Sequence, residues 1–423
     1  MYPLSKEDDT LAHLIQNKKI STFFQPIVSV VKKSVIGLEG LSRGKNSLTG
    51  EFIPPDILFK KAIDSTQRVA LDRLCREKAL NAYQEIVQHD PDLLLFLNID
   101  ASILDKVVGS KHLLRETFKR NLQVDHIVIE INETKVNDLR SLKNFIDNYR
   151  EYGFLIALDD VGSGFSNLDR IPLTKPDIIK IDRGLLQDLD KQYYKQEVFK
   201  SLVGLSKNIG ALVVAEGIET VEEAFISLEL GADLLQGYYF SRPVEAAPRQ
   251  IYRHEDKINL VASRFSTYVN TKNKNERLKL AKYDIMIQDV RAFLMNVSRS
   301  ELDGKMKEIL NKLVSVDCMY VLDSSGFQIS ETACRPNLKT HRSSIFQPAQ
   351  KGENHSLKSY YYSLVNFGLA KYVTSPYISM ATGKLCITIS ATCHDCDNEN
   401  IIFCMDFDPD YFCYDPWYPS FDI

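Results

Sequence analysis

Two adjacent aspartates, Asp159 and Asp160, end an apolar run at residues 155–158 in the stretch LIALDDVGSGFSNL. The run predicts a buried strand, and two like charges at its end repel each other unless a cation lies between them. Carboxylate oxygens suit Mg²⁺ or Mn²⁺ better than they suit zinc. Two such aspartates can serve two ions about 4 Å apart, the arrangement that activates water in two-metal hydrolysis of phosphates.

Other candidate residues occupy the same kind of position, at the C-terminal end of an apolar run. They are Glu39, Asn98, Glu130, Lys180, Glu216 and Gln236. Any single acidic residue, or a lone pair of aspartates, most often belongs to a solvated surface, so the interpretation depends on the whole set. Because the C-terminal ends of parallel barrel strands meet on one rim, we expect these side chains to converge there.

The apolar runs alternate with segments of helical periodicity, as expected of an α/β fold. The predicted strands are residues 23–30, 35–41, 93–99, 126–131, 155–160, 177–181, 211–215 and 234–240, and the predicted helices are 56–88, 104–120, 138–152, 184–208 and 221–230. Eight strands in about 240 residues predict a (β/α)₈ TIM-like barrel. The first two runs are close enough to form a hairpin, so we expect an irregular, antiparallel first strand.

The remainder of the chain has a different pattern. We expect a barrel domain at residues 1–245, a helical linker at 246–313 and a smaller α+β domain at 314–423. Apolar residues at spacings of three and four predict the helices of the linker, which could pair with a second copy in a homodimer. Strand-like runs separated by tight turns predict a small antiparallel sheet after residue 314.

Composition places the chain among ordinary globular proteins, with 44% hydrophobic and 26% charged residues and a net charge of −4. That charge argues against binding to a nucleic-acid polymer. The N-terminal residues lack the apolar segment of a signal peptide, and no apolar stretch is long enough to span a membrane, so we expect a cytoplasmic protein. In a reducing compartment its eight cysteines are expected to be free thiols. Cys393 and Cys396 form half of a zinc or redox motif, without a second half, and are interpreted as ordinary strand or turn residues.

Lys180 has two possible roles at the predicted rim, and two further positions could support it. Lys180 either holds the attacking water and neutralises phosphate charge, or forms a structural ion pair with a neighbouring carboxylate. Glu133 and Glu219 follow Glu130 and Glu216 by three residues and are interpreted as loop supports rather than ligands.

Eight motifs, in order along the first 245 residues, resemble the EAL-domain family of cyclic di-GMP phosphodiesterases. They are FFQPIV, GLEGLSR, LNI, EINET, LDDVGSGFSNL, IIKIDR, VVAEGIET and LLQGYYFSRP. The resemblance implies a barrel that hydrolyses one phosphodiester of cyclic di-GMP to linear pGpG in second-messenger signalling. The C-terminal region resembles PAS or Cache sensor domains, which implies a regulatory role and an unidentified small-molecule ligand.

The same resemblance assigns a role to each candidate residue. Metal ligands, or their immediate supports, would be Glu39, Asn98, Glu130, Asp159, Asp160 and Glu216, holding two ions of Mg²⁺ or Mn²⁺, with Ca²⁺ as an ion that binds without supporting turnover. Lys180 would orient the water, and Glu39, Glu216 and Gln236 would complete the catalytic group. Gln25, Leu41, Arg43 and Asp182 would contact the dinucleotide, while Glu133 and Glu219 would support loops.

One residue departs from the family pattern, and two alternative functions remain. Gly40 stands where the family usually has alanine, and the missing methyl group could loosen the strand end that carries Glu39. The first alternative is a sensor or effector that binds cyclic di-GMP with little or no turnover. The second is proton abstraction beside a carboxylate, as in enolase-type sites, which the ordered motifs make remote.

Overall fold

The computed structural model describes residues 11–46, 49–107, 109–132, 138–163, 168–245, 254–335 and 346–408. The chain divides into two compact units, residues 1–270 and 271–423. The division falls within the segment expected to be a linker, and the expected boundaries at 245 and 313 stay predictions. No helix among the described residues is long and apolar enough to cross a membrane.

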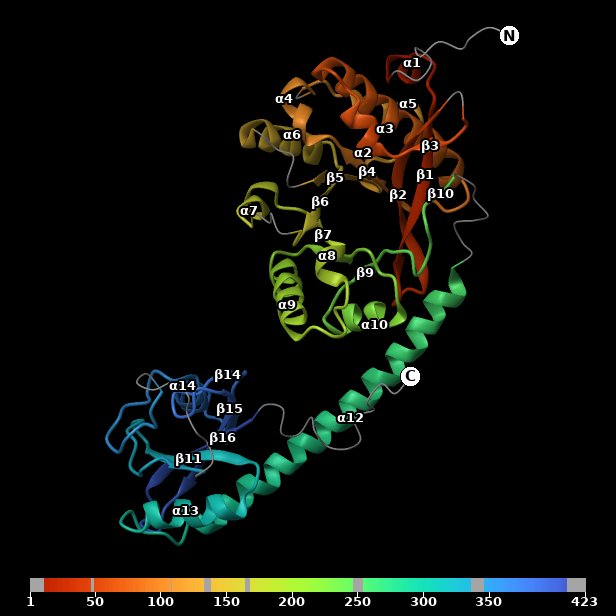
Figure 1. Cartoon of the computed structure of the whole chain (residues 1–423). Helices are drawn as coiled ribbons and strands as arrows, with labels where there is room; N and C mark the ends of the chain where they lie inside the picture. The colour runs from red at the N-terminus through yellow and green to blue at the C-terminus, as the bar shows by residue number, and fades with distance from the viewer. Residues whose placement is uncertain are drawn as a thin grey trace. The chain divides into compact units, whose positions relative to one another are not determined.

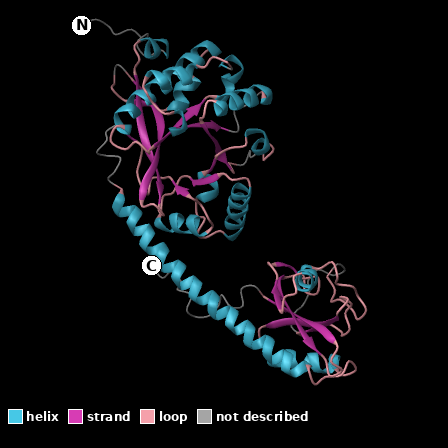
Figure 2. Ribbon diagram, turned by 180° about the vertical axis from the view of Figure 1, so that it is seen from behind, coloured by secondary structure: helices cyan, strands magenta, loops and turns pink. Residues whose placement is uncertain are grey.

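In the first unit, eight of the described strands close a ring. They are β1 (Ile20–Ser29), β2 (Ser34–Lys45), β4 (Leu94–Ile99), β5 (Ile127–Asn132), β6 (Leu155–Val161), β7 (Ile178–Ile181), β8 (Leu212–Ala215) and β9 (Leu234–Leu235). The other seven strands of the ring pair parallel with one another, and β1 closes the ring by pairing antiparallel with β2 and with β9. Figure 2 shows this ring of strands with helices outside it. The predicted TIM-like barrel with an antiparallel first strand is confirmed.

Two short strands extend the hydrogen-bonded sheet beyond the ring: β3 (Phe52–Ile53) pairs with β2, and β10 (Val244–Glu245) pairs with β1. Neither was predicted, because each contributes only two residues. The last predicted strand, 234–240, is also shorter than expected. After β9 the chain leaves the ladder and contacts the loop after β8: the Ile218 N–H donates to the Gln236 carbonyl, and the Tyr239 N–H donates to the Ile218 carbonyl.

The outer layer of the first unit is helical. It contains α1 (Leu11–Gln16), α2 (Pro55–Lys60), α3 (Ser65–Val87), α4 (Leu104–Val107), α5 (His112–Lys119), α6 (Leu139–Glu151), α7 (Arg170–Thr174), α8 (Arg183–Leu186), α9 (Tyr193–Asn208) and α10 (Val221–Glu229). The predicted helix 56–88 is two helices, because Asp64 caps α3 by accepting a hydrogen bond from the Gln67 N–H at 2.8 Å. The predicted helix 184–208 is likewise divided, into α8 and α9.

A layer of apolar side chains fills the barrel interior below the rim. Its buried members are Ile27, Phe96, Val128, Ala157, Ile178, Val214 and Leu234, one from each of seven strands. This layer makes the barrel a packed core rather than a pore. The polar residues that follow along the same strands are therefore left at the open end of the barrel.

The second unit is built on an antiparallel sheet in the order β12-β11-β16-β15-β13, with β14 paired to β15. Its strands are β11 (Val316–Asp323), β12 (Ala333–Cys334), β13 (Lys371–Val373), β14 (Tyr377–Ile378), β15 (Leu385–His394) and β16 (Asn400–Phe407). The C-terminal part of α12 (Glu255–Leu294) and α13 (Leu302–Lys312) cover one face with aliphatic contacts. Helix α14 (Ser359–Asn366) covers the other face (Figure 1). The predicted smaller α+β domain is confirmed as a second, smaller sheet.

The face of this sheet under α14 is buried but unusually polar. We call it the polar face and define it by Tyr320, Thr388, Ser390, Cys404 and Asp406. Hydroxyl groups form hydrogen bonds within this face. The Ser390 hydroxyl donates to the Tyr360 carbonyl at 2.6 Å, and the Thr388 hydroxyl donates to Asp406 at 2.7 Å.

The cysteines are only partly the free thiols that the sequence led us to expect. Cys318 and Cys334 form a disulfide, which corrects that prediction. The two residues face each other in register on the neighbouring strands β11 and β12. Strand register is not visible in the sequence pattern, so this pair could not be identified from it. Cys393 is a free, buried residue of β15, and Cys396 is free and exposed.

Candidate active site

The ammonium group of Lys180, at the end of β7, lies among four carboxylates from four other strands. Its Nζ is 2.5 Å from Glu130 Oε1, 2.6 Å from Glu216 Oε1, and 3.4 Å from both Glu39 Oε2 and Asp159 Oδ1. Lys180 is only 1% exposed. The residues that the sequence places at separate strand ends therefore do converge on one rim.

Two side-chain amides join the same cluster. The Asn98 amide donates to Glu39 Oε1 at 3.0 Å and to Glu130 Oε2 at 2.9 Å. The Gln236 amide donates to Glu39 Oε2 at 2.7 Å, across 197 residues of sequence. Both oxygens of Glu39 are thereby held, so its carboxylate has a fixed orientation before any ligand binds.

A β-bulge brings the two adjacent aspartates to the same side of β6. In a regular strand, successive side chains point to opposite faces. The register of β6 against β7 shifts between Leu158 and Val161, and Asp160 has a left-handed backbone with φ of 58°. As a result, carboxylate oxygens of Asp159, Asp160 and Glu216 all lie within 4.8 Å of one another.

The charges of the cluster are unevenly balanced. Burial disfavours the ammonium form of Lys180, but the charges of Asp159, Glu130 and its other neighbours outweigh burial and raise the pKa of Lys180 well above its ordinary value. Burial raises the pKa of Glu130 well above its ordinary value, and the charge of Glu39 adds to this. Burial likewise raises the pKa of Glu216 well above its ordinary value.

The remaining carboxylates of the rim respond in opposite directions. Burial alone would raise the pKa of Glu39, but the charge of Lys180 and hydrogen bonds from the amides bring this pKa below its ordinary value. Burial and the neighbouring charge of Asp159 raise the pKa of Asp160 to about 6. Most of the rim carboxyls thus hold protons more tightly than usual, as expected where one lysine is shared among five carboxyl groups.

This donor set fits divalent cations that prefer oxygen ligands. The cluster of Asp159, Asp160 and Glu216 offers three oxygens close enough to share an ion. Gln236 Oε1 is buried without a hydrogen-bond partner among the described residues, which is a costly arrangement unless an ion or water binds there. An additional cation would relieve both the excess charge and the unsatisfied oxygen.

The four residues expected to contact a dinucleotide lie around this cluster. Gln25 is opposite Glu39 in the β1–β2 ladder, and its amide donates to the Ser241 carbonyl at 3.1 Å. Leu41 and Arg43 follow Glu39 at alternate positions of β2, so they share its face. Asp182 lies just after β7, where its carboxylate accepts from the Gly184 N–H at 2.8 Å.

The two expected loop supports have different outcomes. Glu133 lies outside the described residues. Glu219 is in the loop after β8, where its carboxylate forms an ion pair with Arg183 at 2.8 Å. Because Arg183 begins α8 after β7, this pair connects two neighbouring loops of the rim. The supporting role of Glu219 stays a prediction.

Sequence reasoning missed two features of the rim. Asn132, the last residue of β5, donates a hydrogen bond from its amide to the Asp160 carboxylate. Its place inside the EINET motif, at a strand end, was a signal that could have identified it. Phe23 lies beneath the Arg43 guanidinium, with its ring centre 5.8 Å from the guanidinium carbon, and packs edge-on against Phe52.

The packing around position 40 explains why glycine fits there, which the family pattern did not suggest. A Cβ atom at this position would lie 3.3 Å from the Ala79 Cβ on α3 and 3.5 Å from a methyl carbon of Leu97. Helix α3 therefore packs closely against this part of β2. The close packing supports the strand end that carries Glu39, so the absence of a methyl group does not leave a void.

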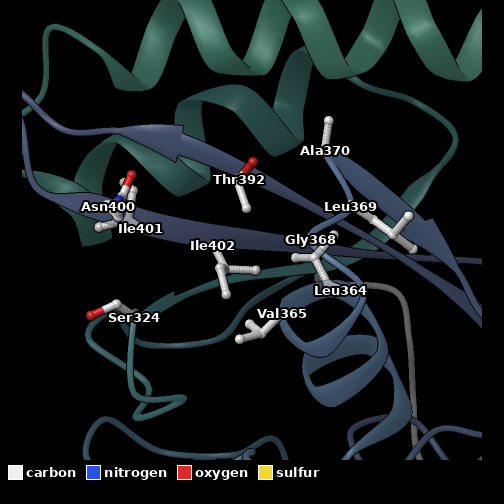
Figure 3. Close-up of a pocket in the computed structure, with 10 residues that line it drawn as sticks. All are labelled: Ser324, Leu364, Val365, Gly368, Leu369, Ala370, Thr392, Asn400, Ile401 and Ile402. Atoms are coloured by element: carbon white, nitrogen blue, oxygen red, sulfur yellow. The ribbon is translucent and has the colours of Figure 1, made fainter.

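A separate pocket of about 440 Å³ lies in the second unit, at one end of the polar face. Leu364 and Val365 of α14 form one side of it, while Thr392 and Ile402 of the sheet lie opposite (Figure 3). The lining combines apolar side chains with the hydroxyl and amide groups of Ser324, Thr392 and Asn400. It offers no cluster of charges comparable to that of the rim.

Comparisons with known proteins cover both units. The profile of the family described as "EAL domain" matches residues 8–243. The chain is 26% identical to the "Uncharacterized EAL-domain containing protein YkuI" of Bacillus subtilis, over 90% of this chain and 93% of that protein. It is 28% identical to the "Cyclic di-GMP phosphodiesterase RocR" of Pseudomonas aeruginosa, over 54% of this chain and 59% of RocR, less than two thirds of that relative's length.

A solved structure resembles the chain over nearly its whole length. It is the crystal structure of the Bacillus subtilis YkuI protein in complex with substrate c-di-GMP and calcium. The TM-score is 0.78 at 26% identity, and the match covers 95% of this chain and 99% of YkuI. The similarity thus includes the second unit as well as the barrel.

Proposed function

The chain belongs to the EAL-domain family, and from that premise we propose that its barrel hydrolyses one phosphodiester bond of cyclic di-GMP to give linear pGpG. The observation that carries the proposal is the convergence of five rim carboxylates with Lys180 at 1% exposure. RocR is named a cyclic di-GMP phosphodiesterase, and YkuI was crystallised with cyclic di-GMP and calcium. Both relatives support the proposed substrate.

Two divalent cations, Mg²⁺ or Mn²⁺, are the proposed cofactors. If all five rim carboxylates are ionised when two divalent ions are bound, their five negative charges are balanced to zero by Lys180 and the two ions. Glu39, Asn98, Glu130, Asp159, Asp160 and Glu216 would hold them. When bound, such ions polarise the phosphate and lower the pKa of a bound water. Ca²⁺ is proposed to bind without supporting turnover.

Lys180 acts as a cation throughout the reaction. Before cations bind, the surrounding carboxylates raise the pKa of Lys180 and favour its ammonium form, which suits a hydrogen-bond donor rather than a base. It orients the attacking water by donating a hydrogen bond, and it opposes the negative charge that develops on the phosphate. Glu39, Glu216 and Gln236 fix the position of this group.

We propose that the dinucleotide binds beside the carboxylates and contacts Gln25, Leu41, Arg43 and Asp182. Arg43 is suited to a bidentate contact with a phosphate. Arg43 is partly buried and its guanidinium group lies over Phe23, so it is partly ordered before the substrate arrives. Contacts of this kind determine which substrate is hydrolysed, while the carboxylates and Lys180 determine the chemistry.

The test is a product assay with purified full-length protein. With Mn²⁺ or Mg²⁺ it should convert cyclic di-GMP to pGpG, and Glu39→Gln should abolish conversion. Glu85→Gln, at an exposed position of α3, is the matched control and should keep full activity. Calorimetric binding of cyclic di-GMP without product at any metal concentration would instead establish the alternative, a binding protein with little or no turnover.

The second unit is proposed to regulate the barrel in response to a small molecule bound in the pocket between α14 and the sheet. A cytoplasmic homodimer is the proposed assembly. Leu278 and Ile285, seven residues apart on α12, are 54% and 60% exposed, which supports contact with a second helix. Light scattering should give a dimer mass, and Leu278→Glu with Ile285→Glu should give a monomer.

A further inference from the structure

The backbone at Asp160 places its side chain without fixing the direction of its carboxylate. Asp160 follows the bulge of β6 and has a left-handed conformation, with φ of 58°. A carboxyl group can rotate about its terminal bond over a broad range of angles. Because Asp160 is only partly buried, packing alone does not restrict this rotation. Another contact is needed to hold one of its oxygens toward Asp159 and Glu216.

Asn132 provides such a contact from the neighbouring strand. Its position is opposite Asp159 in the β5–β6 ladder, and its amide Nδ2 donates a hydrogen bond to Asp160 Oδ2. The position of Asn132 is itself well determined, since Glu130, two residues earlier on β5, is fully buried and paired with Lys180. A rigid strand thus holds the donor in place.

We propose that Asn132 is a positioning residue that orients the Asp160 carboxylate for a divalent cation by holding Oδ2, so that Oδ1 is directed toward the cluster. The inference rests on the metal-dependent function proposed above. An amide is suited to this position because it donates a hydrogen bond without adding another negative charge to a rim of five carboxylates. Asn98 makes the equivalent contact on β4, where its amide holds Glu39 and Glu130.

The direct test measures Mn²⁺ binding to the full-length protein, by calorimetry in the absence of substrate. Asn132→Leu keeps the size of the side chain and removes the donor. Loss of a residue that orients a metal ligand typically weakens metal binding by about 10–100-fold, and we expect a decrease in that range. The Mn²⁺ concentration for half-maximal hydrolysis should rise in parallel, while KM for cyclic di-GMP measured at saturating Mn²⁺ stays within about threefold.

Two further variants separate orientation from a loss of packing. Asn132→Thr and Asn132→Val have nearly the same shape, but only threonine carries a hydroxyl donor. The Thr variant should bind Mn²⁺ more tightly than the Val variant. Asn81→Leu is the matched control, because Asn81 also hydrogen-bonds a charged side chain, Arg120, at 2.6 Å in the helical layer. It should leave the Mn²⁺ affinity unchanged.

The outcomes distinguish this inference from the function on which it rests. If the unsubstituted protein binds Mn²⁺ and hydrolyses cyclic di-GMP, but Asn132→Leu binds Mn²⁺ equally well, the positioning role is wrong and the function stands. Equal affinity of the Thr and Val variants would also overturn it. If the unsubstituted protein binds Mn²⁺ without hydrolysis, the proposed function is wrong, and the same affinities still decide the role of Asn132.

Discussion

The barrel rim and the polar face of the second sheet both bury carboxyl groups, but they neutralise them in different ways. At the rim, Lys180 pairs with four of the five carboxyl groups. On the polar face, Asp406 is 4% exposed and accepts a hydrogen bond from the Thr388 hydroxyl. Burial, opposed by that hydrogen bond, raises the pKa of Asp406 to about 7. A proton therefore neutralises Asp406, whereas a lysine neutralises part of the charge of the rim.

This difference shows which kind of buried charge indicates a binding site. Asp406 is a single group, and protonation satisfies it without any ligand. The rim brings five carboxyl groups together around one ammonium group, so Glu130 and Glu216 also hold protons more tightly than usual unless a cation binds. An excess of like charge that the surrounding residues do not compensate is therefore better evidence for cation binding than burial alone.

The largest effect is expected from a substitution that removes a carboxylate from the rim. Asp159→Asn eliminates one of the oxygens that share the proposed cations, and we expect hydrolysis of cyclic di-GMP to fall by more than about 100-fold, beyond the range typical of residues that only support ligands. Asp406→Asn is the matched substitution on the polar face and should leave hydrolysis within about twofold of the unsubstituted rate, as a product assay would measure. Similar losses in both variants would contradict the comparison.

The second-largest effect is expected on the stability of the barrel. Lys180→Met leaves several buried carboxylates without their shared partner, so the free energy of unfolding of the barrel should fall by about 5 kcal/mol, the upper end of the range for breaking a buried ion pair. Hydrogen exchange of buried barrel amides, measured in a chelator, gives this value. Added Mn²⁺ should restore part of the loss. Unchanged protection of the barrel amides would show that Lys180 is not needed for charge balance.

A smaller effect is expected from pH on the second unit. The pKa of Asp406 is about 7 in the folded state and close to its ordinary value of 3.8 when unfolded, so the folded protein binds the extra proton between these limits. The contribution of Asp406 to the free energy of unfolding should therefore be largest below pH 4, decrease as the pH rises, and become constant above pH 7. The total loss is at most about 4 kcal/mol. Asp406→Asn should remove this slope, as hydrogen exchange of β16 would show; an unaltered slope would contradict the assignment.

The smallest effect is expected at Gly40. A methyl group would meet Ala79 at 3.3 Å, a tight contact, while the substitution would also reduce the flexibility of the unfolded chain. These terms oppose each other, so Gly40→Ala should change the free energy of unfolding by less than about 1 kcal/mol. Hydrolysis should stay within about twofold. A loss of activity with unchanged stability would show that Gly40 sets the geometry of Glu39.

The strands and the rim were predictable from the sequence because burial on both faces leaves a continuous apolar run, and the polar residue that ends each run marks the barrel opening. The bulge at Asp160 was not predictable, since it depends on a register shift against β7. The strand-end position of Asn132 was visible in the EINET motif, but its contact with Asp160 depends on that bulge and was not. Register also explains the unpredicted pair of Cys318 and Cys334, which the sequence separates by 16 positions.

The way the barrel closes has a consequence for its dynamics. The ring is completed where β1 pairs with β9. In this pairing Val28 lies opposite Leu235. The neighbouring hydrogen bond from Gln236 to Glu39 spans the same gap at the rim. A ligand that binds at the rim and restricts Glu39 should therefore also stabilise the junction between β1 and β9. Hydrogen exchange near β9 should then slow more than exchange in the parallel strands opposite it.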